Sequence, residues 1–434
     1  MNRKRLSTTR PYCILLAAVA VVLLIVLGGF NALVDPFAMY RAVEIPGFNT
    51  NKPETQHRVR LYKAFEIERV KPQTVLLGSS RTHTGLRCSH PALSRLDGPC
   101  YNLAFPGART KEIYSYLLHA QSIRPLKHVI LGLDIYHASS GLASTRSDYD
   151  PLLLYSPERP RWFNVITADM RLLTHFDTLS ASITTLQLQK HPVPNFFAPD
   201  GQRRADVFFH HVHPTFMRDG PRAYFDAMDR QAMRDQQGAR PLKNPSGSSS
   251  ESPVDPAESS LAYIRRIVEF CRSQHIDLRI FITPTHVHQS EISVALKGEA
   301  SLGGGKRLLV QLLAEDAARF PNRPPVPLMD FNDYSSVTTD PLPPIGGHQE
   351  MRFYWDSSHF KEIVGDYILD RLFAVSTADP PAPFDFGVIL NTKTLDAVLA
   401  RVRQSRAEYR KASPQDIAEL QSLLPELPIV ATPQ

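Results

Sequence analysis

The sequence predicts an α/β protein built on a parallel sheet, with one transmembrane helix at its N-terminus. Short apolar, β-rich runs alternate with amphipathic helical patterns, and this alternation produces parallel sheets covered by helices on both faces. The predicted strands are residues 74–77, 101–104, 128–133, 278–282 and 326–329. An uncharged stretch from Pro11 to Val34 is long enough to cross a hydrocarbon core of about 30 Å at about 1.5 Å per residue.

Basic residues precede the apolar stretch and indicate its orientation. They are Arg3, Lys4, Arg5 and Arg10, and cations on this side place the N-terminus in the cytoplasm and the remainder outside it. A cleaved signal peptide is the alternative, but no clear A-x-A site precedes Asp35. We therefore expect a single-pass signal anchor in the cytoplasmic (inner) membrane, with the bulk of the chain in the periplasm.

Composition narrows the class of protein. The 434 residues are 43% hydrophobic and 21% charged, which is typical of globular proteins. The net charge of +6 is small for this length, and no basic stripe with interleaved aromatic residues occurs, so we expect no nucleic-acid partner.

The four cysteines have different expected roles. Cys13 lies in the apolar stretch, and Cys271 lies on the apolar side of a predicted helix and is expected in the core. Cys88 and Cys100 bracket a short loop. In an oxidising compartment they form either a disulfide or two half-buried thiols, and the sequence leaves both alternatives open.

The chain divides by composition into five parts. An insertion interrupts the strand–helix alternation, with helices expected near 160–175 and 177–190, a turn at 199–201 and a polar linker at its end. Further helices are expected at 110–123, where Thr110 can act as the cap, from about Phe360, and at 393–411. The parts are a basic tip and anchor (1–34), a connector ending in a helix (35–70), an α/β domain (71–137 and 258–375), the insertion (138–257) and a helical tail (376–434).

The residues that follow each predicted strand are the candidate ligand-binding residues, because open parallel sheets bind ligands at the carboxyl ends of their strands. Along the chain, these strand-end residues are Ser79, Ser80 and Arg81, then Gly107, then Asp134, then His286 and His288, and finally Asp356 and His359.

This set contains the groups that nucleophilic catalysis needs. A serine hydroxyl requires a base within hydrogen-bond reach, and a carboxylate orients that base. Asp356-x-x-His359 supplies the pair, Ser80 is the candidate nucleophile, and the amides of Ser80 and Gly107 are candidate oxyanion donors. Taken singly, Ser79-Ser80 reads as a strand-to-helix turn and Asp356 as a helix cap. Their order and placement together favour a catalytic site.

Three motifs resemble those of the SGNH, or GDSL-like, hydrolases. They are "LLGSSR" with Ser80, "NLAFPG" with Gly107 and "WDSSHF" with Asp356 and His359, and the resemblance covers about 70–137 and 258–375. It implies a flavodoxin-like three-layer α/β/α fold, action on ester bonds, and no metal or organic cofactor. The order of an N-terminal anchor, an Asp-Pro pair and a strand that ends in GSSR most resembles an exported, membrane-anchored branch of the family. This branch includes proteins similar to alginate O-acetyltransferases and teichoic-acid D-alanylation proteins.

The motif after the third predicted strand differs from the motif that the SGNH hydrolases have at this place. The family has Gly-x-Asn-Asp there, whereas this chain has Gly132-Leu133-Asp134. An ionised Asp134 cannot donate a hydrogen bond as asparagine does. We expect Asp134 to pair instead with Arg81 across neighbouring strands.

Several other residues have competing interpretations. A metal site is suggested by the close spacing of three histidines, His210, His211 and His213. No cysteine or carboxylate lies beside them at the spacing of metal ligands, so solvent-exposed or packing roles are favoured. His286 and His288 are either substrate contacts or structural. Trp355 is expected to pack.

The sequence thus predicts a membrane-anchored, exported SGNH-like serine esterase or O-acyltransferase acting on a cell-envelope glycan or other acyl ester. Its partners are the membrane and a glycan or acyl-donor substrate. The alternative is a non-catalytic envelope protein of the same fold that binds a glycan or a partner in an export complex.

Overall fold

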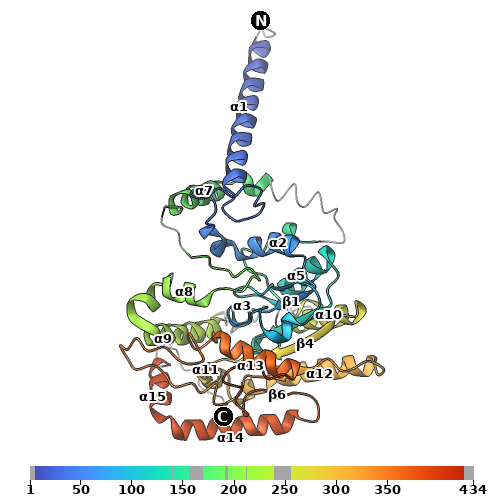
Figure 1. Ribbon diagram of the computed structural model, residues 1–434, viewed down its shortest axis with the longest axis vertical. Helices are drawn as coiled ribbons and strands as arrows, with labels where there is room; N and C mark the ends of the chain where they lie inside the picture. The colour runs from blue at the N-terminus through green and yellow to red at the C-terminus, as the bar shows by residue number, and fades with distance from the viewer. Residues whose placement is uncertain are drawn as a thin grey trace, which may run out of the picture. The chain divides into compact units, whose positions relative to one another are not determined.

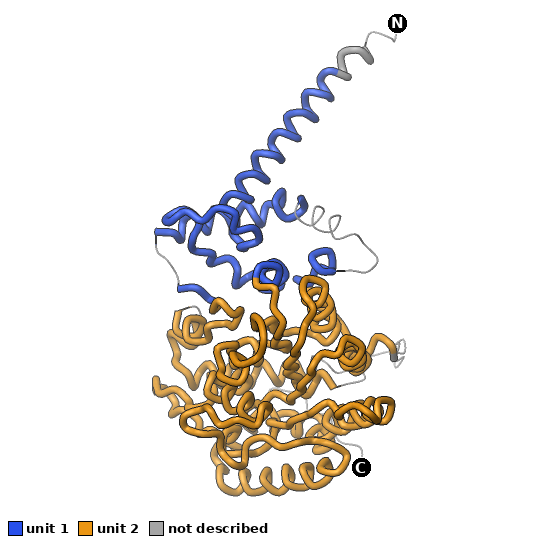
Figure 2. The backbone as a smooth tube through the Cα atoms, turned by 45° about the vertical axis from the view of Figure 1, so that its right-hand side comes forward, with its two compact units in different colours: residues 1–69, 148–196 blue, residues 70–147, 197–434 orange. Residues whose placement is uncertain are grey.

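The computed structural model describes residues 5–138, 141, 143–155, 170–190, 194–211, 213–238 and 256–424. The chain divides into two compact units (Figure 2), which are residues 1–69 with 148–196, and residues 70–147 with 197–434. We call them unit 1 and unit 2. The expected insertion, 138–257, contributes to both units, and its first expected helix lies largely outside the described residues.

Unit 1 contains the long apolar helix α1, Arg5–Val34 (Figure 1). Its segment Pro11–Val34 is the one helix of the described chain long and apolar enough to cross a membrane, and residues 11–26 of it are exposed. The other helices of unit 1 are η1 (Pro53–Arg58), α2 (Val59–Val70), η3 (Pro151–Leu153) and α7 (Phe176–Leu188). The helix expected at 177–190 is confirmed as α7.

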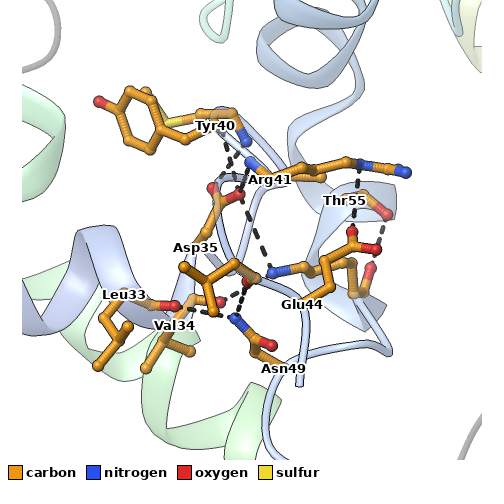
Figure 3. A network of polar contacts seen from close by, with 12 residues as sticks. Leu33, Val34, Asp35, Tyr40, Arg41, Glu44, Asn49 and Thr55 are labelled. Carbon is orange, nitrogen blue, oxygen red and sulfur yellow. Dashed lines mark hydrogen bonds and ion pairs between the residues drawn. The ribbon is translucent and has the colours of Figure 1, made fainter. Parts of the chain in front are cut away.

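A polar network ends α1 (Figure 3). The carboxylate of Asp35 accepts hydrogen bonds from the backbone N–H groups of Met39 and Arg41, both at 2.7 Å. Asn49 donates to the carbonyl of Leu33 at 2.9 Å, and Lys52 donates to that of Val34 at 2.9 Å. These side chains satisfy carbonyls that a helix C-terminus leaves without intrahelical partners.

Unit 2 is built on a six-stranded sheet of order β2-β1-β3-β4-β5-β6, in which only the β5–β6 pair is antiparallel. The strands are β1 (Thr74–Leu77), β2 (Cys100–Asn102), β3 (His128–Leu133), β4 (Asp277–Ile282), β5 (Leu328–Asp330) and β6 (Val388–Ile389). All five predicted strands are present, although β5 begins two residues later than expected. Strand β6 was not predicted, because two residues show no periodicity.

Helices enclose this sheet. Helix α13 (Glu362–Phe373) packs against α3 (Ser80–Gly85) and α4 (Pro91–Ser94), and shares a core with Leu76, Ile130 and Phe281 of the sheet. Helix α10 (Ser260–Ser273) packs against α5 (Thr110–Ile123), α12 (Gly304–Arg319) and β4. The strands are therefore buried, as predicted for a parallel sheet.

The remaining elements of unit 2 lie outside this framework. They are η2 (Ile135–His137), α8 (Ala205–His211), α9 (Pro214–Gly238), η4 (Pro256–Glu258), α11 (Val287–Lys297), η5 (Glu299–Leu302), α14 (Leu395–Ala412) and α15 (Pro414–Leu423). The predicted helix at 393–411 is confirmed as α14, whereas α15 was not predicted.

Three local expectations are resolved. Cys88 and Cys100 form a disulfide, and Cys271 is buried in α10. The capping prediction for α5 was wrong by one residue: Arg109 is the N-cap and Thr110 is the first helical residue. The side chain of Glu112 accepts the Arg109 N–H at 2.9 Å, so the carboxylate in the first turn satisfies the helix start.

Candidate active site

The turn between β1 and α3 separates the roles of the two serines. Gly78 has a φ of +150°, and a Cβ there would lie 2.8 Å from the carbonyl oxygen of Gly132, so only glycine fits this turn. Ser79 is the N-cap of α3, and its hydroxyl accepts the Arg81 N–H at 3.4 Å. Ser80 is the first residue of the helix, which leaves its hydroxyl available to another partner.

That partner is His359. The distance from Ser80 Oγ to His359 Nε2 is 2.8 Å, and the distance from His359 Nδ1 to Asp356 Oδ2 is also 2.8 Å. Asp356 is fully buried, and Ser80 and His359 are partly exposed. A carboxylate on Nδ1 selects the tautomer whose Nε2 accepts a proton from the serine.

The turn that carries Asp356 and His359 is held from several sides. Asp356 Oδ1 accepts the N–H groups of Ser358 at 2.6 Å and His359 at 2.9 Å, and the Trp355 N–H donates to the His359 carbonyl at 2.9 Å. Trp355 stacks on Phe209 at 4.9 Å between ring centroids, which agrees with its expected packing role. These contacts fix the position of the His359 side chain, the candidate base.

Backbone amides near Ser80 are suited to stabilising negative charge. The Ser80 N–H lies in the first turn of α3, where amides have no intrahelical acceptor. The loop that carries Gly107 is tied to the β1–α3 turn by a 3.3 Å hydrogen bond from the Phe105 N–H to the Gly78 carbonyl. Gly107 itself has a φ of +60°, a left-handed conformation that favours glycine.

Asp134 forms the expected ion pair with Arg81, with 2.9 Å between Arg81 Nη1 and Asp134 Oδ1. Both residues are buried. Thr283 and Tyr136 each donate a hydroxyl hydrogen bond to the carboxylate at 2.6 Å. Burial alone would raise the pKa of Asp134, but the charge of Arg81, together with His137 and the hydrogen bonds from Thr283 and Tyr136, outweighs it, and the pKa lies well below its ordinary value. Asp134 is therefore an ionised acceptor.

Arg81 also reaches the turn of the candidate base. Its Nε donates to the Ser358 carbonyl at 3.1 Å, and its Nη2 donates to the Ser358 hydroxyl at 3.0 Å. Sequence reasoning missed Ser358, Thr283 and Tyr136 as parts of this network. Thr283 directly follows β4, so its strand-end position was the available signal.

His286 and His288 are structural in this fold. His286 is buried, its Nε2 is 2.9 Å from the Asp340 carbonyl, and its N–H donates to the Ser357 carbonyl at 3.1 Å. His288 is buried too, and its Nδ1 is 2.8 Å from Asp229 Oδ2. Burial, reinforced by His288, holds the pKa of His286 well below its ordinary value. These contacts favour the structural interpretation of the pair over substrate contact.

His210 and His213 of the insertion have protein partners. His210 lies 2.7 Å from Glu350, and His213 packs edge-on against Tyr224 at 4.2 Å between centroids. Within the described ranges, no group of three His, Cys, Asp or Glu residues is placed to hold a metal ion. The packing interpretation of these histidines agrees with their contacts.

No family model matches the chain, and no curated protein matches it.

Proposed function

We propose that this protein is a serine esterase or O-acyltransferase of SGNH-like type, anchored in the cytoplasmic membrane and acting outside it on a cell-envelope glycan or another acyl ester. The observation that carries the proposal is the hydrogen-bonded series Ser80–His359–Asp356, with 2.8 Å at each step. Three residues distant in sequence converge here in the order that nucleophilic catalysis requires.

The fold supports the proposal. The strand order 2-1-3-4-5 is that of flavodoxin-like doubly wound sheets, which bind ligands at the carboxyl ends of their strands. Ser80 follows β1 closely, and the loop with Gly107 follows β2. These are the positions of the motifs that resemble the SGNH hydrolases.

The proposed reaction has two steps. Ser80 Oγ attacks the acyl carbonyl while His359 Nε2 takes the hydroxyl proton, and Asp356 stabilises the resulting imidazolium. The amides of Ser80 and Gly107 stabilise the oxyanion, and His359 returns the proton to the departing alcohol oxygen. Water or a glycan hydroxyl then takes the acyl group from Ser80, again with His359 as base and then acid.

The test uses the full chain in detergent, a fluorophosphonate probe and a small aryl acetate. We expect wild type to be labelled, and Ser80→Ala to lose labelling and at least about 10³-fold of any hydrolysis. Ser94→Ala, an exposed serine of α4, is the matched control and should retain both. Labelling that persists in Ser80→Ala would remove Ser80 from the nucleophile role.

The second candidate is a non-catalytic envelope protein that binds a glycan or an export-complex partner. The Asp134–Arg81 pair favours it, because a carboxylate stands where the family has an oxyanion-hole asparagine. Loss of one such donor costs about 10²–10³ in rate. Folded wild-type protein that is neither labelled nor hydrolytic, yet binds glycan oligomers, would select this candidate.

A further inference from the structure

In the described part of unit 1, a set of large apolar side chains is exposed. Phe176 is 79% exposed and Met170 is 65% exposed, and about half of the surface of Leu33, Val43 and Ile45 is exposed. We call these five residues the apolar rim. Scattered exposed apolar residues are normal, so the significance of the rim depends on where its members lie.

Two rim residues flank a segment that packs against α1. A Cβ added at Gly28 of α1 would lie 3.8 Å from Leu173 Cβ, and the Asn31 side chain donates to the Leu173 carbonyl at 2.7 Å. Ser182 of α7 donates to the Asn31 side chain at 2.8 Å in a buried contact. Met170 and Phe176, on either side of Leu173, therefore lie beside the last turns of α1.

The other rim residues are held at the end of α1. Asn49 donates to the carbonyl of Leu33 at 2.9 Å (Figure 3). It also donates to the carbonyl of Val43 at 2.8 Å, and its side-chain oxygen accepts the Ile45 N–H at 2.8 Å. The side chain of Asn49 is thus a clamp that brings Val43 and Ile45 next to Leu33.

The clamp is reinforced by buried charge. Lys52 Nζ lies 4.0 Å from Asp35 Oδ2, with both side chains almost fully buried. Asp35 also accepts backbone hydrogen bonds from residues 39 to 41. The segment after α1 is therefore a fixed part of unit 1 and not a free linker.

The length of the helix sets the depth of the rim. The apolar segment has 24 residues, which at about 1.5 Å per residue is about 36 Å, compared with a hydrocarbon core of about 30 Å. With Pro11 at the inner boundary, the outer boundary falls about 20 residues later, near Asn31. Gly28 then lies just inside the hydrocarbon, and the segment against it lies at the boundary with the headgroups.

We propose that the apolar rim inserts into the outer headgroup region of the same bilayer and forms a second membrane contact beside the span. The lipid bilayer is the occupant because the rim is continuous with a helix whose residues 11–26 are all exposed. The proposal rests on the proposed membrane span, but not on the proposed ester chemistry.

The test is spin labelling of the full chain in liposomes, in a Cys13→Ala background where Cys271 is buried and Cys88–Cys100 is bonded. Labels at Phe176→Cys, Met170→Cys and Val43→Cys are compared with Phe384→Cys, a 98% exposed phenylalanine of unit 2. Val22→Cys, in the middle of α1, reports on the span itself. The measurement is the accessibility of each label to dissolved oxygen and to a water-soluble nickel chelate.

We expect a ratio of oxygen to nickel accessibility at least several-fold higher at the three rim positions than at residue 384, with residue 22 higher still. If the accessibility ratios at the rim positions match that at residue 384 while residue 22 lies in lipid, the proposed membrane contact of the rim is wrong and the membrane span stands. A water-exposed residue 22 would overturn the span and the rim together. Spin–spin broadening with shielding from both reagents would show that a second copy covers the rim, which also contradicts the proposal. Fluorophosphonate labelling of the same samples reports separately on the chemistry.

Discussion

Arg81 connects the two parts of the candidate site at the scale of single residues. It follows the candidate nucleophile, pairs with Asp134 after β3, and donates to Ser358 between Asp356 and His359. The guanidinium is buried, so its hydrogen bonds are not shared with water. Arg81 is accordingly a positioning residue for the base.

Substitution of Asp134 tests this network. From the sequence alone, Asp134→Asn would add an oxyanion donor and raise hydrolysis. In the structure, the carboxylate is fully engaged with Arg81, Thr283 and Tyr136. We therefore expect Asp134→Asn to lower both turnover and stability, the latter by up to about 3–5 kcal/mol, the usual cost of leaving a buried charge unpaired.

The measurements are urea unfolding and aryl acetate hydrolysis. Arg81→Met combined with Asp134→Asn is the control, because removal of both charges should cost less stability than the sum of the single changes. Additive costs, or a gain of hydrolysis in Asp134→Asn, would contradict the positioning role.

Asp333 predicts a pH dependence. Burial, with the neighbouring charge of Asp330, raises the pKa of Asp333 from 3.8 to about 6. A raised pKa means that the folded state holds the proton more tightly, so this contribution to stability is present at low pH and is lost as the pH rises through about 6. The rise from 3.8 to about 6 corresponds to about 3 kcal/mol.

Asp333→Asn should remove this dependence. We expect the difference in unfolding free energy between pH 5 and pH 8 to change by about 1.4 kcal/mol relative to wild type, in the direction of less loss at pH 8, because the part of the loss between pH 3.8 and pH 5 lies outside this range. Asp97→Asn, at an exposed carboxylate, should leave the difference unchanged. Identical pH profiles for wild type and Asp333→Asn would refute the raised pKa.

At the scale of elements, the crossing of α3 and α13 brings the candidate nucleophile to its base. A Cβ added at Gly365 of α13 would overlap the carbonyl oxygen of Gly85, the last residue of α3. A Cβ at Gly85 would overlap the ring of Phe360, which follows His359. The close approach of these helices therefore depends on two positions without side chains.

Gly365→Ala should separate the helices and misplace Ser80 relative to His359. We expect at least about 10²-fold loss of hydrolysis, since a displacement of about 1 Å can cost that much, together with about 1–3 kcal/mol of stability from overpacking. Gly304→Ala is the matched control, because a Cβ there meets nothing within 4 Å. Equal activity in both variants would show that the crossing does not position the site.

The Cys88–Cys100 disulfide closes the loop between α3 and β2. The two residues are 12 positions apart, and loop entropy assigns about 3 kcal/mol to a bond of this span. We expect Cys88→Ala/Cys100→Ala to lower the free energy of unfolding by about that amount and to abolish the destabilising effect of a reductant. Cys13→Ala, which removes no bond, is the control. If a reductant still lowers the stability of the double variant, the loss of stability is not caused by reduction of the Cys88–Cys100 bond.

At the scale of the whole molecule, the basic residues before the apolar segment Pro11–Val34 predict the orientation of α1. A phosphatase reporter that is active only outside the cytoplasm, fused after Gln434, should be active, because positive flanks are retained in the cytoplasm. Replacement of Arg3, Lys4, Arg5 and Arg10 by glutamine should weaken this preference. An inactive phosphatase with an active cytoplasmic reporter at the same position would reverse the topology.

The sequence by itself determined the features encoded by local periodicity and strand order. The apolar span, the five parallel strands, α5 and α14 all have patterns that run within one element, and such patterns are set by burial along that element. The Arg81–Asp134 pair was predictable as well, because consecutive βα units place their strand ends at one edge of a sheet.

Only the tertiary structure decided which strand-end residues meet. His286 and Asp356 were both candidate site residues because each follows a predicted strand. In the structure, His286 is buried against Asp340, whereas Asp356 contacts His359. The approach of α13 to α3, the stacking of Trp355 on Phe209 and the Asn49 clamp join segments far apart in the chain. Contacts of this kind leave no periodic signal, because side-chain complementarity between packed elements selects them and neither element encodes that complementarity alone.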